Sequence, residues 1–188
     1  MRVLVIYESV YGNTHRIADA VATGLRDRDG VEVELVTPED AEDAGRFEGV
    51  DLLVVGGPTH MHGMAWSTTK HQGAHAEQEA AAKGKPAHEL DDDAFGETLR
   101  HWFHHLPQGG DTPSAAFDTR FDAAPAMTGR ASKGIARRLH HHGWAAVVEP
   151  ESFLVTKDNE LVDGEEDRAR TWGEQLADAV VGRAPTTT

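Results

Sequence analysis

The amino-acid sequence predicts a doubly wound α/β protein, in which a five-stranded parallel sheet lies between two layers of helices in an α/β/α sandwich. Short apolar runs, which suit strands buried on both faces, alternate along the chain with segments whose apolar residues recur at helical spacing. The 188 residues are enough for one domain with a substantial core. In such folds, ligands bind at the carboxyl ends of the strands.

Three strands are predicted in the first third of the chain. Residues 2–7 form an apolar run, residues 31–36 alternate, and residues 51–57 form a second apolar run that ends in a glycine pair. A helix is expected over about 13–26, and residues 37–40 can begin a short helix. The apolar face of the longer helix consists of Ile17, Val21 and Leu25, with Ala18 and Ala22 beside them.

The rest of the sheet is expected at 114–121 and in a fifth strand, formed by 144–148 and 152–156 and interrupted by Pro150. Helices are expected at 94–106, at 132–143 with Gly143 in the terminating position, and from 163–166 onward. The expected buried faces are Phe95, Leu99, Trp102, Phe103 and Leu106 in the first helix, and Ala169, Trp172, Leu176 and Val180 in the last.

A long connection, residues 64–93, separates the third strand from the next helix. Residues 76–83 favour a helix, and residues 83–93 indicate an exposed, mobile loop. The connection is compatible with a cover over a ligand, with a partner contact and with a plain mobile insertion. We expect a single domain over 1–183 and a disordered tail over 184–188.

The composition narrows the function. The net charge of −14 argues against nucleic-acid and anionic-membrane partners, and it fits both docking to a basic protein and simple solubility. Because there are no cysteines, disulfides and thiolate metal sites are impossible, and redox chemistry would require a bound cofactor. We see no targeting segment and no membrane span, and we expect a cytoplasmic protein.

The polar loop between the first strand and its helix has the features of an anion site. A helix N-terminus offers unpaired amides and partial positive charge. Ser9, Asn13 and Thr14 add side-chain donors, and Gly12 allows close backbone approach. The loop has no lysine and no GxGxxG pattern, so a small phosphate monoester suits it better than a nucleoside triphosphate or a dinucleotide. The alternative is that its polar side chains only cap the helix.

The sequence of this loop, Ser9-Val10-Tyr11-Gly12-Asn13-Thr14, resembles the FMN phosphate loop of the flavodoxin-like family. The usual family pattern is [ST]-x-[ST]-G-x-T. With tyrosine in third position, the loop is more similar to the S-x-Y-G-[NH]-T version of multidomain flavoproteins and flavodoxin-like quinone reductases. The resemblance covers nearly the whole chain, and the FDTR sequence after the fourth strand also resembles actinobacterial flavodoxin-like proteins. It implies FMN as cofactor and the strand order 2-1-3-4-5.

The resemblance further implies that the isoalloxazine ring lies between the loops after the third and fourth strands. In the first of these loops, Gly63 would permit a backbone turn near the flavin N5 atom. A histidine there could tune the redox potential or could be an exposed loop residue. No aromatic residue precedes Trp66, so Met61 or an imidazole would cover the ring. The expected ring-lining residues are Pro58, Thr59, His60 and Met61.

The second ring loop is expected to act through three polar residues. Asp118 and Thr119 would hydrogen-bond the pyrimidine edge or the ribityl chain. Arg120 would stabilise an anionic reduced flavin. Alternatively, Asp118 and Arg120 form a surface ion pair of little energetic weight.

The 12 histidines suggest a metal site only weakly. His71 and His75 would share a helix face, and further clusters occur at 101–105 and 140–142. A fixed site needs three or four converging ligands. We therefore expect surface histidines and no metal.

The favoured interpretation is an FMN-binding electron-transfer protein that carries electrons between redox partners and has no catalytic side chain. Asp91, Asp92 and Asp93 would steer a basic partner protein. One alternative is an FMN-dependent NAD(P)H:quinone reductase-like enzyme or a nitroreductase. Another is a cofactor-free flavodoxin-like binding module. The sequence leaves the oligomeric state open.

Overall fold

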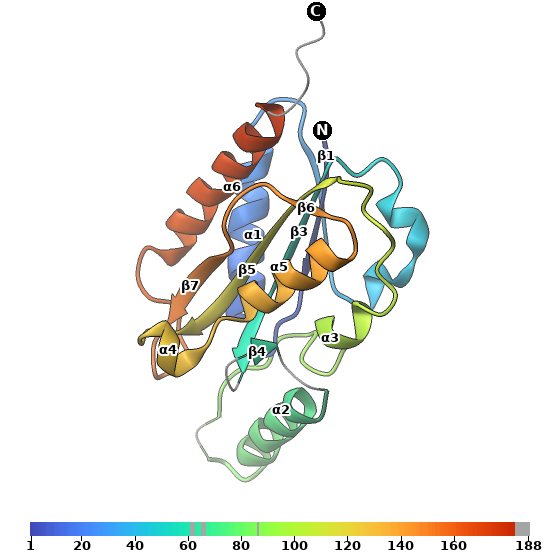
Figure 1. The fold of residues 1–188 in the computed structure, drawn as a ribbon. Helices are drawn as coiled ribbons and strands as arrows, with labels where there is room; N and C mark the ends of the chain where they lie inside the picture. Colours follow the sequence, from blue (N-terminus) through green and yellow to red (C-terminus); the bar gives the residue numbers. More distant parts are fainter. Residues whose placement is uncertain (61–62, 65–66, 86, 183–188) are drawn as a thin grey trace, which may run out of the picture.

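A central parallel sheet has the strand order β2-β1-β3-β5, and two short strands, β6 and β7, both pair with the outer edge of β5 (Figure 1). The computed structural model describes residues 1–60, 63–64, 67–85 and 87–182, so the predicted disordered tail lies outside the described residues. The predicted order is confirmed, with the fifth strand divided in two. The strands are β1 (Arg2–Tyr7), β2 (Glu32–Val36), β3 (Leu52–His60), β5 (Pro113–Phe121), β6 (Ala145–Ala146) and β7 (Glu151–Val155).

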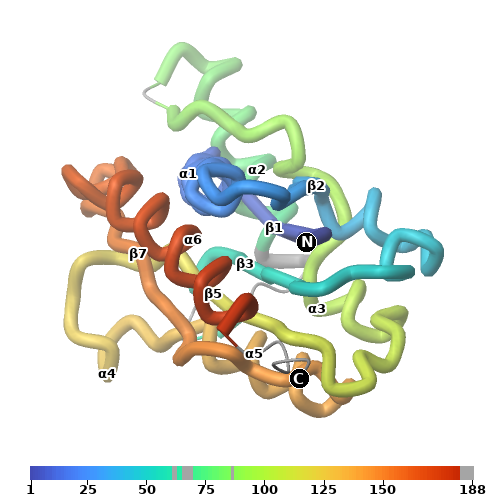
Figure 2. The backbone as a smooth tube through the Cα atoms, turned by 90° about the horizontal axis from the view of Figure 1, so that it is seen from above, coloured from blue at the N-terminus to red at the C-terminus, as the bar shows by residue number. Residues whose placement is uncertain are grey.

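Helices cover both faces of the sheet, which confirms the three layers (Figure 2). α1 (Asn13–Arg26) and α6 (Glu165–Val181) share one hydrophobic core with one face of the sheet. α5 (Ala131–His141) and α3 (Leu99–Trp102) share a second core with the opposite face. Two 3₁₀ turns, η1 (Asp40–Glu42) and η2 (Ala44–Phe47), border that second core.

The packing of α1 on α6 depends on two glycines. A Cβ atom at Gly24 would lie 1.9 Å from the backbone oxygen of Arg170. A Cβ atom at Gly173 would lie 2.3 Å from the backbone oxygen of Val21. The two helix backbones therefore approach as closely as glycine permits. The predicted apolar faces are confirmed on both helices, with Val180 only partly buried.

The predicted helix over 94–106 is wrong, because only Leu99–Trp102 is α-helical. The chain turns first at Gly96, whose N–H donates to the backbone oxygen of Asp93, and Thr98 then caps a new helix start. Pro107 disfavours helical backbone at the preceding residue. The apolar positions are still buried as predicted, except Phe95, which is 38% exposed.

The long connection is ordered over the described residues. β4 (Gly63–Met64) returns along the end of β3 as a short antiparallel partner, and α2 (Ser67–Ala82) follows it below the carboxyl edge of the sheet (Figure 1). The predicted helical segment is therefore longer than expected. The expectation that the whole of residues 83–93 is an exposed loop is wrong, because the Asp91 and Asp93 side chains are only 4% and 8% exposed.

None of the described helices combines the length and the apolar composition that a membrane span requires.

Candidate functional site

A cavity of about 240 Å³ opens at the carboxyl ends of β1, β3, β5 and β7. It brings together ten of the residues that the sequence predicts for the site, from all three predicted loops. They are Ser9, Val10, Tyr11, Asn13, Thr14, Pro58, Thr59, His60, Thr119 and Arg120.

The first turn of α1 faces this cavity without a side-chain cap, so the capping interpretation of the loop is wrong. Gly12 precedes the helix in the left-handed region, at φ 80°, and donates its N–H to Ser9 Oγ at 3.1 Å. Among the described residues, the amides of Asn13 and Thr14 have no acceptor. These amides and the helix dipole are available to an anion.

Two side chains of the loop reach other strand ends. Thr14 Oγ1 lies 2.7 Å from Thr119 Oγ1, which joins the loop to the end of β5. Asn13 Nδ2 donates to the backbone oxygen of Asn159 at 2.8 Å, and Asn159 adopts φ 60° in the turn after β7. Both contacts fix the loop against the strand ends that complete the cavity.

The long connection packs against the outside of the same loop. Val10 is buried with Ala74 of α2, and the Asp91 N–H donates to the Val10 backbone oxygen at 2.9 Å. The Asp91 carboxylate lies 3.1 Å from His15 Nδ1, and the His15 ring stacks on Tyr7 at 4.5 Å. The described part of the connection therefore covers the outside of the loop, and none of its described residues lines the cavity.

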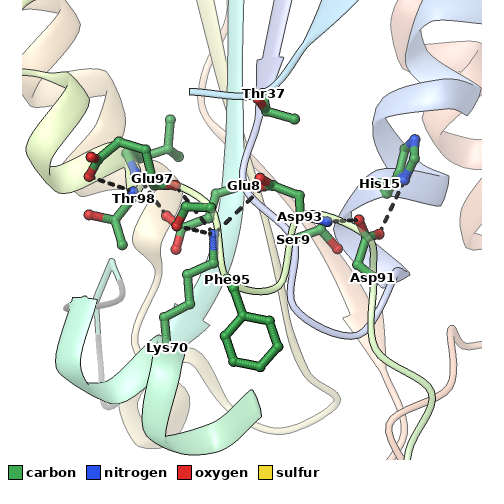
Figure 3. A network of polar contacts seen from close by, with 12 residues as sticks. Glu8, Ser9, His15, Thr37, Lys70, Asp91, Asp93, Phe95, Glu97 and Thr98 are labelled. Atoms are coloured by element: carbon green, nitrogen blue, oxygen red, sulfur yellow. Dashed lines mark hydrogen bonds and ion pairs between the residues drawn. The ribbon is translucent and has the colours of Figure 1, made fainter. Parts of the chain in front are cut away.

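Behind the loop lies a buried cluster of three charged side chains, Glu8, Lys70 and Asp93 (Figure 3). Glu8 Oε2 accepts the Leu99 N–H at 3.0 Å, whereas Oε1 has no partner among the described residues. Lys70 Nζ lies 3.6 Å from Asp93 Oδ2 and donates to the backbone oxygen of Gly96 at 3.1 Å. The cluster thus ties β1, α2 and the turn before α3 together.

Burial controls the protonation of this cluster. Desolvation raises the pKa of Glu8 to about 7, although the charge of Lys70 acts in the opposite direction. Desolvation likewise raises the pKa of Asp93 to about 6.

The prediction that Asp91, Asp92 and Asp93 form a steering surface is wrong, because only Asp92 is exposed.

At the other end of the cavity, His60 is half-buried and its Nε2 atom has no hydrogen-bond partner among the described residues. Burial lowers the pKa of His60, and the charge of Lys70 lowers it further, so the imidazole is neutral at pH 7. Thr59 Oγ1 accepts the Ala131 N–H at 2.9 Å, which anchors the end of β3 to α5.

Arg120 turns back on its own loop. Its Nη1 atom donates to the backbone oxygens of Phe121 and Ala123, at 3.1 and 2.7 Å, while Nε has no partner among the described residues. The alternative of an ion pair between Arg120 and Asp118 is wrong. Asp118 is fully buried and accepts the Ser132 N–H at 2.7 Å, so it holds the start of α5.

Among the described residues, three predicted site residues do not line the cavity. Asp118 points to α5 because successive strand residues face opposite sides of a sheet. Gly63 lies in β4 and lines a second cavity, and Gly12 borders the outer surface of the loop. Met61 lies outside the described residues.

Sequence reasoning missed three lining residues, Phe121, Val155 and Asn159. Phe121 is 50% exposed and supplies the aromatic residue that the loop after β3 lacks. The period of two along β5 could have found it, since Thr119 and Phe121 lie on the same side. The Asp158-Asn159 turn also carried a signal, because asparagine tolerates the left-handed backbone.

Two groups of histidines in the described part of the chain lie next to other side chains outside the first cavity. His71 and His75 share a face of α2 and contact the Phe95 ring, at centroid distances of 6.2 and 5.0 Å. His101 Nδ1 lies 3.2 Å from Glu97 Oε2, and with Glu42 these side chains place three ligand-type atoms within 4.8 Å of one another. The second group was not predicted, and it lies away from the residues that line the cavity.

Sequence comparison agrees with this geometry. Residues 4–81 match the family model described as a flavodoxin domain. Over 67 residues the chain is 42% identical to a flavodoxin of Aquifex aeolicus (strain VF5), and the aligned part is 35% of this chain. It also spans only about a third of that relative, 35% of its length.

Solved structures match the fold over almost the whole chain. A flavodoxin from the domain Archaea has a TM-score of 0.62 at 19% identity, covering 96% of this chain and 99% of that one. Oxidised flavodoxin 1 from Bacillus cereus has a TM-score of 0.63 at 19% identity, covering 95% and 98%. A flavodoxin mutant from Pseudomonas aeruginosa has a TM-score of 0.64 at 16% identity, covering 97% and 100%.

The chain is a doubly wound α/β protein with a cavity at the carboxyl edge of its sheet, beside a helix N-terminus that has no side-chain cap. Residues 4–81 resemble a flavodoxin domain, and the fold of almost the whole chain matches that of solved flavodoxins.

Proposed function

We propose that the protein binds FMN in the first cavity and transfers electrons between redox partners in the cytoplasm. The observation that carries this proposal is the uncapped first turn of α1, which opens into the same cavity as the ends of β3 and β5. A phosphate group at the helix and a planar ring between the two strand ends would use both parts of the cavity.

The phosphate end suits a monoester held by neutral donors. The amides of Asn13 and Thr14, the helix dipole and the Thr14 hydroxyl would hold it. Gly12 permits the left-handed turn, at φ 80°, that leads into these amides. No lysine lines this cavity in the described part of the chain, which fits a phosphate monoester better than a triphosphate.

The ring end offers an aromatic face, a neutral imidazole and a cation. Phe121 would cover one face of the ring. His60 would donate or accept a hydrogen bond through its unpartnered Nε2 without adding charge. Arg120 would favour an anionic form of the ring. FMN supplies reversible one- and two-electron redox chemistry, and these side chains set its environment.

The size of the cavity supports a carrier. Its volume of about 240 Å³ is below the roughly 300–1,000 Å³ of pockets that enclose a whole ligand. Part of the ring would therefore stay exposed for electron transfer to another protein. The net charge of −14 favours a basic partner, although the steering residues must lie elsewhere than at the buried Asp91 and Asp93.

The test is a titration of apoprotein with FMN, followed by flavin fluorescence. We expect saturable binding of one FMN per chain at micromolar protein. Added NADPH and a quinone should give no turnover without a separate reductase. Absence of any fluorescence change would contradict the binding proposal, and turnover without a reductase would favour the quinone reductase alternative.

A further inference from the structure

A second cavity, of about 490 Å³, lies on the other side of the β3–β4 hairpin, and its walls are strongly basic. The contrast with the whole molecule is large, because the protein carries 32 acidic and 18 basic residues. The lining residues are Gly63, Met64, Arg100, Arg130, Gly134, Arg137, Arg138, His141 and His142. No carboxylate is among them in the described part of the chain.

The charge segregation is already present in the sequence. No aspartate or glutamate occurs between Asp122 and Glu149, and this stretch includes α5 and the loop before it. Three of the four arginines in the cavity come from this stretch. The basic wall is thus a property of one continuous segment, and it does not depend on chance contacts between distant surface residues.

Neutral groups hold two of these arginines in place. Arg130 donates from Nε to Ser152 Oγ at 2.9 Å and from Nη2 to the Pro150 backbone oxygen. The guanidinium of Arg138 lies over the Phe103 ring, 5.6 Å from its centroid. Such contacts orient a guanidinium without neutralising it.

The remaining two arginines add further positive charge to the wall. Arg137 is exposed and forms no ion pair or hydrogen bond with the described residues. Arg100 donates from Nη2 to the Met64 backbone oxygen at 3.0 Å. Burial lowers the pKa of Arg100 and the positive charge of Arg138 lowers it further, whereas the charge of Glu8 raises it. The guanidinium groups therefore repel one another across the cavity, and an anion between them would relieve that repulsion.

We propose that this second cavity binds a small molecule that carries a pyrophosphate group. Guanidinium groups match phosphate oxygens in bidentate geometry, and several of them suit two linked phosphates better than one. The volume lies within the range of small-molecule sites, which favours such a ligand over a docking protein. Gly134 adds no side chain to the wall, and a Cβ atom there would make only an ordinary contact with Met64 Cε at 3.6 Å.

The position of the cavity also matters for function. Thr59 and His60 line the first cavity, while their antiparallel partners Met64 and Gly63 line the second. A ligand in the second cavity would therefore be a direct neighbour of whatever occupies the first. A nicotinamide dinucleotide and a free pyrophosphate share the recognised group, and only the dinucleotide carries an electron-donating ring.

Isothermal titration calorimetry of the full chain with inorganic pyrophosphate, ADP and NADPH, at constant ionic strength, tests the proposal. We expect pyrophosphate-bearing ligands to bind at least tenfold more tightly than sulfate. NADPH binding more tightly than pyrophosphate would identify the dinucleotide as the source, and equal binding would identify the pyrophosphate group alone. Because the start of α1 can itself hold a phosphate group, variants of each cavity are needed to assign the heat to the second one.

Variants locate the binding. Arg137→Gln should weaken pyrophosphate binding about tenfold, because it removes one guanidinium group from the wall. The fold should be unaffected, because this side chain forms no ion pair or hydrogen bond with the described residues. Lys133→Gln is the matched control on the exposed face of the same helix and should change it less than twofold. Thr14→Ala should leave it unchanged, since Thr14 lines the first cavity. Overturning results are no preference over sulfate, equal effects of all three variants, or binding of polyglutamate in place of pyrophosphate.

Discussion

The hydroxyl of Thr14 sits where the helix dipole, the loop and the end of β5 meet. It lies 2.7 Å from the Thr119 hydroxyl, and either oxygen can be the donor of that hydrogen bond. When Thr119 donates, the Thr14 proton remains available to a phosphate oxygen. The Thr14 hydroxyl could therefore add a donor to the unpaired amides in the first turn of α1, where the phosphate of the proposed ligand would bind.

Thr14→Ala should weaken FMN binding about tenfold while changing riboflavin binding less than threefold, because only FMN carries the phosphate. Fluorescence titration with both flavins measures the difference. Thr23→Ala is the control, since Thr23 is exposed on the same helix. Equal weakening of both flavins by Thr14→Ala would contradict a phosphate role for this residue.

Glu8 makes the stability of the protein depend on pH. Its pKa rises from an ordinary value of 4.5 to about 7 on folding, so between these values the folded protein binds more protons than the unfolded chain. The free energy of unfolding therefore falls as pH rises through this window, by on the order of 3 kcal/mol from Glu8 alone. Asp93 acts in the same direction, because burial also raises its pKa.

Glu8→Gln should flatten this dependence, since glutamine keeps an oxygen for the Leu99 N–H but does not ionise. Urea unfolding at intervals between pH 5 and 8 measures it. The wild type should lose stability over this range, and the variant should lose clearly less. Parallel curves for the two proteins would show that the Glu8 carboxyl does not titrate in the window.

At the scale of elements, the spacing of apolar residues predicted the helices and strands that pack into the two cores. α1, α5 and α6 and the sheet strands were predicted because each has a regular buried face. The helix over 94–106 was wrong although Leu99, Trp102 and Phe103 are buried, because a local turn and the Thr98 cap set the helix start. The periodicity of apolar residues reports which side chains are buried. A segment of turns that buries the same side chains can therefore have the same periodicity as a helix.

The close approach of α1 and α6 depends on the lack of a side chain at Gly24. Gly24→Ala would place a Cβ atom 1.9 Å from a backbone oxygen and should lower the free energy of unfolding by about 1–3 kcal/mol. Gly134→Ala in α5 is the control, since its Cβ atom would meet only Met64 Cε at 3.6 Å and alanine favours a helix. Urea unfolding compares them. Similar effects of both changes would contradict the packing account.

At the scale of the whole molecule, the fold was more predictable than the site. The loop proposed to hold the phosphate was predicted from its own residues, whereas the residues proposed for the ring end depend on strand parity and on contacts far apart in the chain. Asp118 and Thr119 show the difference, because a step of one residue along β5 separates a side chain that contacts α5 from one that lines the cavity. The burial of Asp91 and Asp93 likewise required the fold of α2 against the loop.

The central claim is that FMN lies in the first cavity with its phosphate at the start of α1. Amide chemical shifts of isotope-labelled protein, titrated with FMN and separately with riboflavin, test it most directly. We predict that FMN shifts the Gly12, Asn13 and Thr14 amides far more than riboflavin does, and that both flavins shift His60 and Phe121. Saturable binding of FMN that leaves the amides of the α1 first turn unmoved would contradict the claim.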